Sequence, residues 1–199
     1  MDRPKPAVKT PVIALCGKGG VGKTSAAGLF IKHLVNDPNR RVLAIDADPS
    51  VGLATALGVT VHKTVDDIRS ELIRQLEAGV SGDRRELAAR LDYDVLAALA
   101  ERGNLAFLAI GRPEKEGCYC QVNHILKDII ASMAEQFDFV VIDGEAGIEQ
   151  VNRRVMESVT HLVLISAGSV KGLNVAARIR EVADTAIGFH TAGLIVHRI

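Results

Sequence analysis

Short apolar runs alternate with amphipathic stretches along most of this chain of 199 residues. Most of the runs are nearly continuous in Val, Ile and Leu, as in strands buried on both faces of a sheet. We predict strands over Val12–Cys16, Val42–Asp46, Leu105–Ile110, Phe139–Asp143, His161–Ser166 and Gly193–His197. Helical patterns lie at about 23–36, 65–78, 84–102, 122–135, 149–157 and 172–186. The alternation predicts an α/β fold, a mainly parallel sheet with helices on both faces.

The segment at about 61–104, between the second and third predicted strands, is long enough for two helices, whereas one crossover helix would be enough to connect the strands. Thr64 and Asp67 make a plausible capping box for the first of them, and Gly79 a stop. We interpret this segment as a helical insertion, either a lid or partner surface or a helical pair that completes the layer. Residues 1–11 have no apolar run after their early charges, so we expect a flexible leader before a single domain over 12–199.

Composition excludes several classes of protein. The 24 basic and 24 acidic side chains cancel, which argues against a protein that coats nucleic acid through a general positive field. No stretch approaches the roughly twenty apolar residues of a membrane helix. We therefore expect a cytoplasmic protein with neither nucleic acid nor membrane as a partner. Three cysteines, two of them only two residues apart, do not resemble a secreted disulfide framework.

The strongest motif follows the first predicted strand and opens a helix. Gly17 to Thr24 satisfies G-x-x-x-x-G-K-[ST], the loop whose backbone N–H groups close around phosphate oxygens. Lys23 can reach the β- and γ-phosphates, and the Thr24 hydroxyl can bind Mg²⁺. The same glycines fit the G-x-G-x-x-G of dinucleotide sites, but only a triphosphate–Mg²⁺ site requires Lys23 and Thr24. The predicted nucleotide-binding segment is Gly17, Lys18, Gly19, Gly20, Val21, Gly22, Lys23, Thr24 and Ser25.

Carboxylates end two further predicted strands. Asp46 and Asp48 point the same way, out of the carboxyl end of the second strand, where ligands bind in such sheets. Asp143 ends the fourth predicted strand and suits a Walker-B role, bound to Mg²⁺ directly or through water. Gly147 completes D-x-x-x-G, whose backbone N–H could contact the γ-phosphate. The alternatives are that Asp46 and Asp48 are solvated acids at the end of a strand, and that Asp143 and the glycines after it form an ordinary turn.

Cys118 and Cys120 allow three interpretations. They are incidental thiols, a strained local disulfide, or metal ligands. One C-x-C motif supplies two sulfur ligands, whereas a closed thiolate site for Zn²⁺ requires four. Two copies of the motif, related by a twofold axis, would complete such a site. Cys16 is best interpreted as a core residue. His124, one helical turn after Cys120, is more often a surface residue than a ligand in such a position.

The stretch Lys18-Gly-Gly-Val-Gly-Lys23-Thr24 resembles the deviant Walker A motif of the MinD/ParA/nitrogenase-iron-protein group of P-loop ATPases. The resemblance implies that Lys18 crosses a dimer interface to the partner's nucleotide phosphates. It makes Lys18, Lys23 and Asp48 catalytic, with Asp48 orienting the attacking water. Asp46 then supports the Mg²⁺ or water network, alongside Thr24 and Asp143.

The cysteine pair and Asp143-Gly-Glu-Ala-Gly-Ile-Glu149 narrow the resemblance to the CooC-type nickel-insertion ATPases. That resemblance implies an ATP-dependent homodimer whose Cys118 and Cys120 hold one Ni²⁺ or Zn²⁺ per dimer and which serves a carbon monoxide dehydrogenase or related nickel enzyme. His197 stands where the family usually has an asparagine that contacts the base, and it could stack on the base or hydrogen-bond to it as a nucleotide-binding residue. A positioning or partition ATPase, or a reductase related to the nitrogenase iron protein, would share the phosphate loop.

Overall fold

The computed structural model describes residues 10–79, 84–112, 120–144, 155 and 159–197. In chain order, the elements within these residues are β1 (Val12–Gly17), α1 (Lys23–Val35), β2 (Val42–Asp46), α2 (Gly52–Leu57), α3 (Val65–Glu77), α4 (Arg84–Ala97), β3 (Ala100–Arg102), β4 (Leu105–Ala109), α5 (Cys120–Ala134), β5 (Phe139–Asp143), β6 (His161–Ala167), α7 (Val170–Ala186) and β7 (Thr191–His197). All six predicted strands are present, and the helix predicted at 149–157 lies largely outside the described residues.

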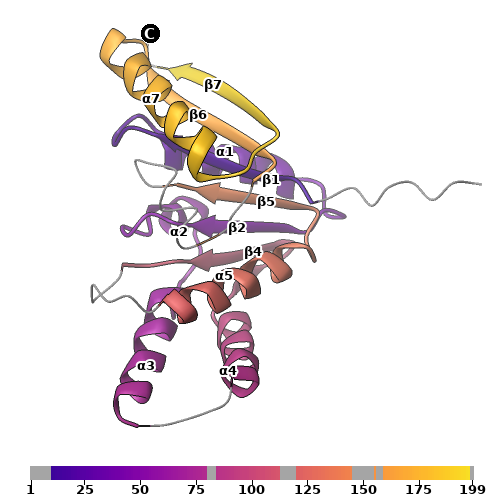
Figure 1. Ribbon diagram of the computed structural model, residues 1–199. Helices are drawn as coiled ribbons and strands as arrows, with labels where there is room; N and C mark the ends of the chain where they lie inside the picture. The colour runs from indigo at the N-terminus through magenta and orange to yellow at the C-terminus, as the bar shows by residue number, and fades with distance from the viewer. Residues whose placement is uncertain (1–9, 80–83, 113–119, 145–154, 156–158, 198–199) are drawn as a thin grey trace, which may run out of the picture.

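The described strands form one seven-stranded sheet in the order β3-β4-β2-β5-β1-β6-β7 (Figure 1). Every neighbouring pair is parallel except β3 and β4. The first strand, β1, therefore lies inside the sheet, between β5 and β6. This arrangement confirms the predicted fold class, and it brings the carboxyl ends of the parallel strands to one edge.

Period-two alternation divides the core between the two faces of the sheet. On one face, Val42 and Ala44 of β2 pack with buried residues of α1 and α2. On the other, Leu43 and Ile45 pack with α3, α4, α5 and α7. Both faces of β2 and β4 are fully buried, which explains their continuous apolar sequences.

Two elements differ from the sequence prediction. The helix predicted over 84–102 ends at Ala97, and Ala100–Arg102 turns back as an antiparallel edge strand against β4. Gly103, with φ +61°, makes this tight turn possible. The short helix α2 was not predicted, because six residues are too few to show a helical period.

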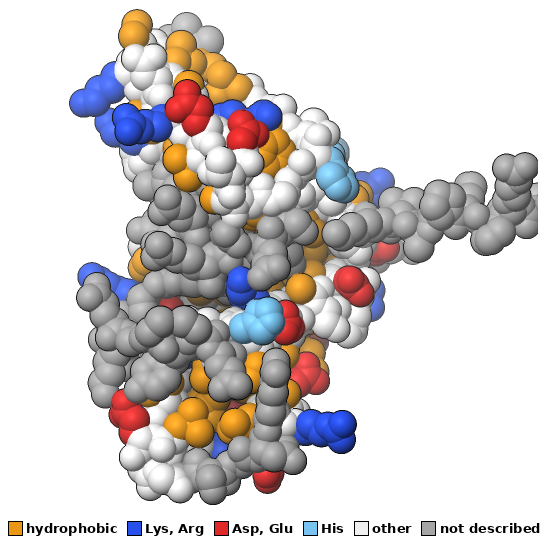
Figure 2. All heavy atoms as spheres, viewed as in Figure 1, with side chains coloured by type: hydrophobic (Ala, Val, Ile, Leu, Met, Phe, Trp, Pro, Cys, Tyr) orange, Lys and Arg blue, Asp and Glu red, His pale blue; other side chains and the backbone are white. Residues whose placement is uncertain are grey.

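The helical insertion consists of α3 and α4, which project beyond the β4 side of the sheet (Figure 1). Thr64 and Asp67 form the predicted capping box, and Gly79 follows the end of α3 with φ +84°. Among the described residues on the face drawn in Figure 2, basic and acidic side chains are interspersed. This face matches the balanced composition of the chain.

Candidate nucleotide-binding site

The carboxyl edge of the sheet gathers residues that are far apart in the sequence. Asp46 and Asp143 are direct register partners on the adjacent strands β2 and β5. Gly17 ends β1 beside Ile165 of β6, and His197 ends β7. The structure thus brings the phosphate loop, two predicted magnesium ligands and His197 to the same edge.

Backbone geometry accounts for three glycines of the loop. A Cβ atom at Gly17 would lie 2.2 Å from the carbonyl oxygen of Ile165, so no larger residue fits between β1 and β6. Gly20 and Gly22 have φ of +79° and +93°, in the left-handed region that glycine adopts without strain. The loop is therefore shaped by the close approach of Gly17 to β6 and by the left-handed backbone conformations of Gly20 and Gly22. The helix α1 then begins at Lys23.

The loop lysine is folded into its own loop. Lys23 is buried, and its Nζ donates a hydrogen bond of 3.3 Å to the carbonyl oxygen of Lys18. The backbone N–H groups at the start of α1 have no intrahelical partners, which makes this end of the helix electropositive. A buried ammonium beside such N–H groups suits a phosphate chain.

Asp46 is fully buried and held by backbone donors. Its Oδ1 accepts from the N–H of Asp48 at 3.1 Å, and its Oδ2 accepts from the N–H of Leu53 at 2.9 Å. Burial raises the pKa of Asp46 from 3.8 to about 6, and the nearby Asp143 carboxylate adds to that shift, while the two N–H donors oppose it. The second of these donors belongs to α2, so sequence reasoning gave no sign of it.

Asp143 is buried, and its surroundings offset the cost of burying its charge only in part. Neither carboxylate oxygen has a hydrogen-bond partner among the described residues. Burial raises the pKa of Asp143, while the neighbouring Thr24 hydroxyl and the Lys23 ammonium lower it. A buried carboxylate with free lone pairs, beside a second carboxylate and a hydroxyl, is the donor set that a hard cation prefers.

The loop after β2 is constrained by its own side chains. The Oδ1 of Asp48 accepts hydrogen bonds from the N–H and the Oγ of Ser50, at 2.9 and 2.6 Å. Val51 then takes a left-handed conformation with φ +51° at the start of α2. For a β-branched residue this conformation costs of order 1–3 kcal/mol, and such strain gathers at functional loops.

His197 lies against the phosphate loop. Its Nε2 contacts the carbonyl oxygen of Val21, and a Cβ atom at Gly22 would lie 2.5 Å from the same nitrogen. The contact joins positions 176 residues apart. The sequence prediction placed His197 near the base of a nucleotide; the structure places it at the loop, a contact that the sequence did not indicate.

The remaining predicted residues are described only in part. Cys118 and Gly147 lie outside the described residues, and Cys120 is the first residue of α5. Within the described part of the chain, no group of three or more His, Cys, Asp and Glu side chains could hold a metal ion. Cys16 is buried in the core, as predicted, and burial raises the pKa of its thiol to about 12.

The sequence model of the AAA domain family (AAA_31) matches residues 10–186. The chain belongs to this family. A relative named as an uncharacterized ATP-binding protein, from Methanocaldococcus jannaschii, is 43% identical over 179 residues, covering 87% of this chain and 68% of its own. The carbon monoxide dehydrogenase accessory protein CooC of Rhodospirillum rubrum is 31% identical over 180 residues, covering 86% of this chain and 68% of its own.

Solved structures share the fold of this AAA domain. One is the septum site-determining protein MinD of Pyrococcus horikoshii, complexed with Mg-ADP. The match covers 94% of this chain and 70% of the MinD chain, with a TM-score of 0.62 and 22% identity. The match to a ParA family ATPase of Chlorobium tepidum covers 94% of this chain and 73% of the ParA chain, with a TM-score of 0.61 and 20% identity. These matches confirm the P-loop ATPase fold. Among the described helices, none has the length and apolar character needed to cross a membrane.

The buried carboxylate of Asp46 predicts a pH dependence of stability for this AAA domain. Because its folded pKa of about 6 exceeds its ordinary value of 3.8, its contribution to stability is full below about pH 4 and is lost as the pH rises through 6. That loss should reach about 3 kcal/mol. Asp46→Asn removes the titration, so its unfolding free energy in urea, relative to wild type, should rise between pH 4.5 and 7.5. The exposed Asp92→Asn variant should show no such trend; equal trends in both would contradict the prediction.

Proposed function

We propose that this protein is an Mg²⁺-dependent ATPase that acts as a homodimer and carries Ni²⁺ or Zn²⁺ on Cys118 and Cys120 for a carbon monoxide dehydrogenase or related nickel enzyme. The observation that carries the ATPase part is the burial of Asp143 beside Asp46 and the phosphate-loop residues Lys23 and Thr24, with no geometric hydrogen bond to either carboxylate oxygen among the described residues. The relation to CooC, together with the spacing of the two cysteines, supports the metal part.

The residues of the site fit a nucleotide with a bound cation. The loop from Gly17 to Thr24, together with Ser25, would hold the phosphates through backbone N–H groups, with the Lys23 ammonium on the β- and γ-oxygens. Asp143, Asp46 and the Thr24 hydroxyl would hold Mg²⁺, which neutralises charge on the phosphate oxygens when bound. Lys18, exposed at the tip of the loop, would reach the nucleotide of a second copy.

Asp48 would orient the attacking water. It lies in the loop between β2 and α2, two residues after Asp46, and its Oδ1 already accepts hydrogen bonds from Ser50. Asp48→Asn keeps an oxygen that can accept the Ser50 N–H, so the loop should retain its shape. We expect ATP hydrolysis, measured by phosphate release, to slow roughly 100-fold or more. Nucleotide affinity, measured by ADP titration, should change little. Unchanged turnover would remove this role from Asp48, and Asp92→Asn serves as the charge-matched control.

Metal titration tests the metallochaperone part. Wild-type protein should bind one Ni²⁺ per dimer, more tightly with a slowly hydrolysed ATP analogue than with ADP. Cys118→Ser/Cys120→Ser should abolish that binding, because one pair from each subunit supplies the four sulfurs. Cys16→Ala is the matched control, since Cys16 is buried in the core and should not affect binding. Absence of binding in the wild type, or equal binding by the double variant, would overturn this part.

A positioning or partition ATPase is the second candidate function. MinD of Bacillus subtilis is 23% identical over 194 residues, and the solved structures of MinD and ParA proteins share the fold. A protein of this type would bind anionic vesicles or DNA when loaded with ATP, and would do so without its cysteines. ATP-dependent sedimentation with either, unchanged in Cys118→Ser/Cys120→Ser, would favour it over the metallochaperone.

A further inference from the structure

A cavity of about 440 Å³ lies between α1, α2 and the amino end of β4. Because β4 runs parallel to its neighbour β2, this end of the sheet is opposite the edge that carries Asp46 and Asp143. The cavity is lined mainly by apolar side chains, with three polar ones: Gly28, Ile31, Lys32, Val35, Ala56, Leu57, Arg102, Asn104 and Leu105. Its size and its apolar lining with few polar groups are those of a small-molecule site.

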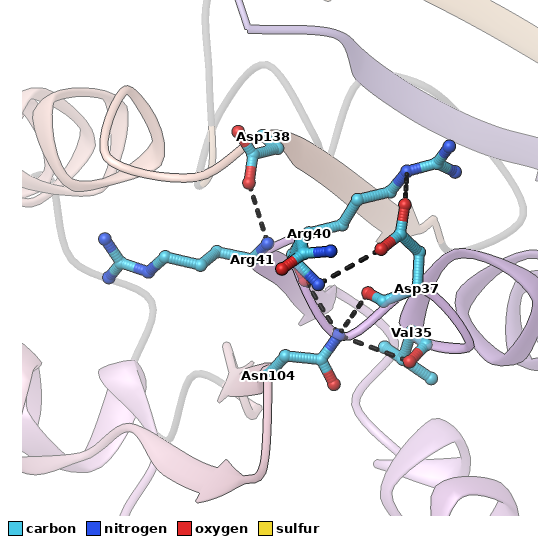
Figure 3. A network of polar contacts seen from close by, with 7 residues as sticks. Val35, Asp37, Arg40, Arg41, Asn104 and Asp138 are labelled. Atoms are coloured by element: carbon cyan, nitrogen blue, oxygen red, sulfur yellow. Dashed lines mark hydrogen bonds and ion pairs between the residues drawn. The ribbon is translucent and has the colours of Figure 1, made fainter.

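Two side chains of the β3–β4 turn hold the walls of the cavity in place. The amide nitrogen of Asn104 donates to the carbonyl oxygens of Val35, Asp37 and Arg40, at 3.2, 3.0 and 2.8 Å, and so caps the carboxyl end of α1 (Figure 3). The Nη1 of Arg102 donates to the carbonyl oxygen of Leu57 at 2.9 Å, at the end of α2. Each helix is thus tied at its carboxyl end to the same turn.

The polar lining is positively charged. Lys32 is exposed on α1 and has no hydrogen bond or ion pair within the described part of the chain. Arg102 is positioned by Leu57, and a Cβ atom at Gly58 would lie only 3.1 Å from its Nη1. None of the described residues that line the cavity is acidic. Two cations beside a space walled by aliphatic side chains complement a molecule with an anionic head and an apolar body.

We propose that this cavity binds a small amphiphilic anion, its head group on Lys32 and Arg102 and its apolar body between α1 and α2, and that binding alters the affinity for nucleotide. The link is the two helices themselves. Lys23 and Thr24 open α1, and the N–H of Leu53 in α2 holds the Asp46 carboxylate. A ligand that shifts α2 against α1 therefore changes the distance between the phosphate loop and Asp46.

Sodium decanoate below its micellar concentration is a suitable probe, measured by isothermal titration calorimetry. We expect saturable binding of one molecule per chain. Lys32→Glu should weaken it at least tenfold, whereas Arg178→Glu, the same charge change on exposed α7, should leave it unchanged. Ala56→Phe, which places a bulky ring at the cavity, should also abolish binding. Equal affinity in all three variants would overturn the proposal.

Two further probes separate the head group from the apolar body. Decanol and inorganic phosphate should each bind at least tenfold more weakly than decanoate. If either binds as tightly as decanoate, the site does not recognise an amphiphilic anion. Saturating Mg-ADP should change the decanoate affinity by at least threefold, and decanoate should change the ADP affinity by the same factor, because linkage is reciprocal. Identical decanoate affinities with and without Mg-ADP would overturn the link to the nucleotide site.

Discussion

Replacing Lys23 with methionine is expected to weaken ATP binding at least about 100-fold. The side chain is buried at the start of α1, and its ammonium would exchange the Lys18 carbonyl oxygen for phosphate oxygens when nucleotide binds. A charge-assisted hydrogen bond contributes about 1.5–3 kcal/mol, so the loss of two such bonds accounts for this factor. Methionine fills a similar volume, and the core around α1 should keep its packing.

The measurement is titration of a fluorescent ATP analogue, with thermal unfolding as the check on folding. Arg178→Met is the control, because Arg178 is an exposed cation two turns into α7, beyond the helix start that follows the carboxyl end of β6. Its affinity should equal that of the wild type. If Lys23→Met is well folded and binds ATP as tightly as the wild type, the loop does not hold phosphate in the way its geometry indicates.

Asp143→Asn should stabilise the nucleotide-free protein while removing its response to Mg²⁺. The wild-type carboxylate is buried with no partner for either oxygen among the described residues, so neutralising it relieves a desolvation cost. We expect a gain of about 1 kcal/mol in unfolding free energy. Without the charge, Mg²⁺ should no longer strengthen nucleotide binding, and hydrolysis should fall about 100-fold or more.

Thermal and urea unfolding, each with and without Mg²⁺ and ADP, check both parts of this prediction. The wild type should gain more stability from Mg-ADP than from ADP alone, and Asp143→Asn should gain the same from both. Asp92→Asn should behave as the wild type in every condition. A variant that is less stable than the wild type and still responds to Mg²⁺ would show that Asp143 has a structural role only.

The fold was largely predictable because its signals are local. Continuous apolar runs such as Val42–Asp46 follow from burial on both faces, and the capping box at Thr64 lies within four residues. The elements that were missed, α2 and β3, are too short to show a period. β3 also carries the charged residues Glu101 and Arg102, and it pairs only because the turn at Gly103 returns it to the sheet edge.

The candidate site was predictable only where a sequence motif or the end of a predicted strand indicated it. Asp46 and Asp143 pair because β2 and β5 are parallel neighbours that end at the same edge of the sheet. Two other contacts of the site were not predictable: the Leu53 N–H donates to Asp46, and His197 contacts the phosphate loop at Val21. Neither has a signature in the sequence, because each depends on how separate elements pack. The functions of the cysteine pair and of Gly147 stay predictions.

The central place of β1 fixes when the site can form during protein synthesis. β1 leaves the ribosome before the other described strands, yet its neighbours in the sheet are β5 and β6, which are made more than a hundred residues later. The loop that follows β1 is held by Ile165 and finally by His197. ATP therefore cannot assist the folding of the amino-terminal half, and a nascent chain becomes competent to bind it only once nearly all of these residues have emerged.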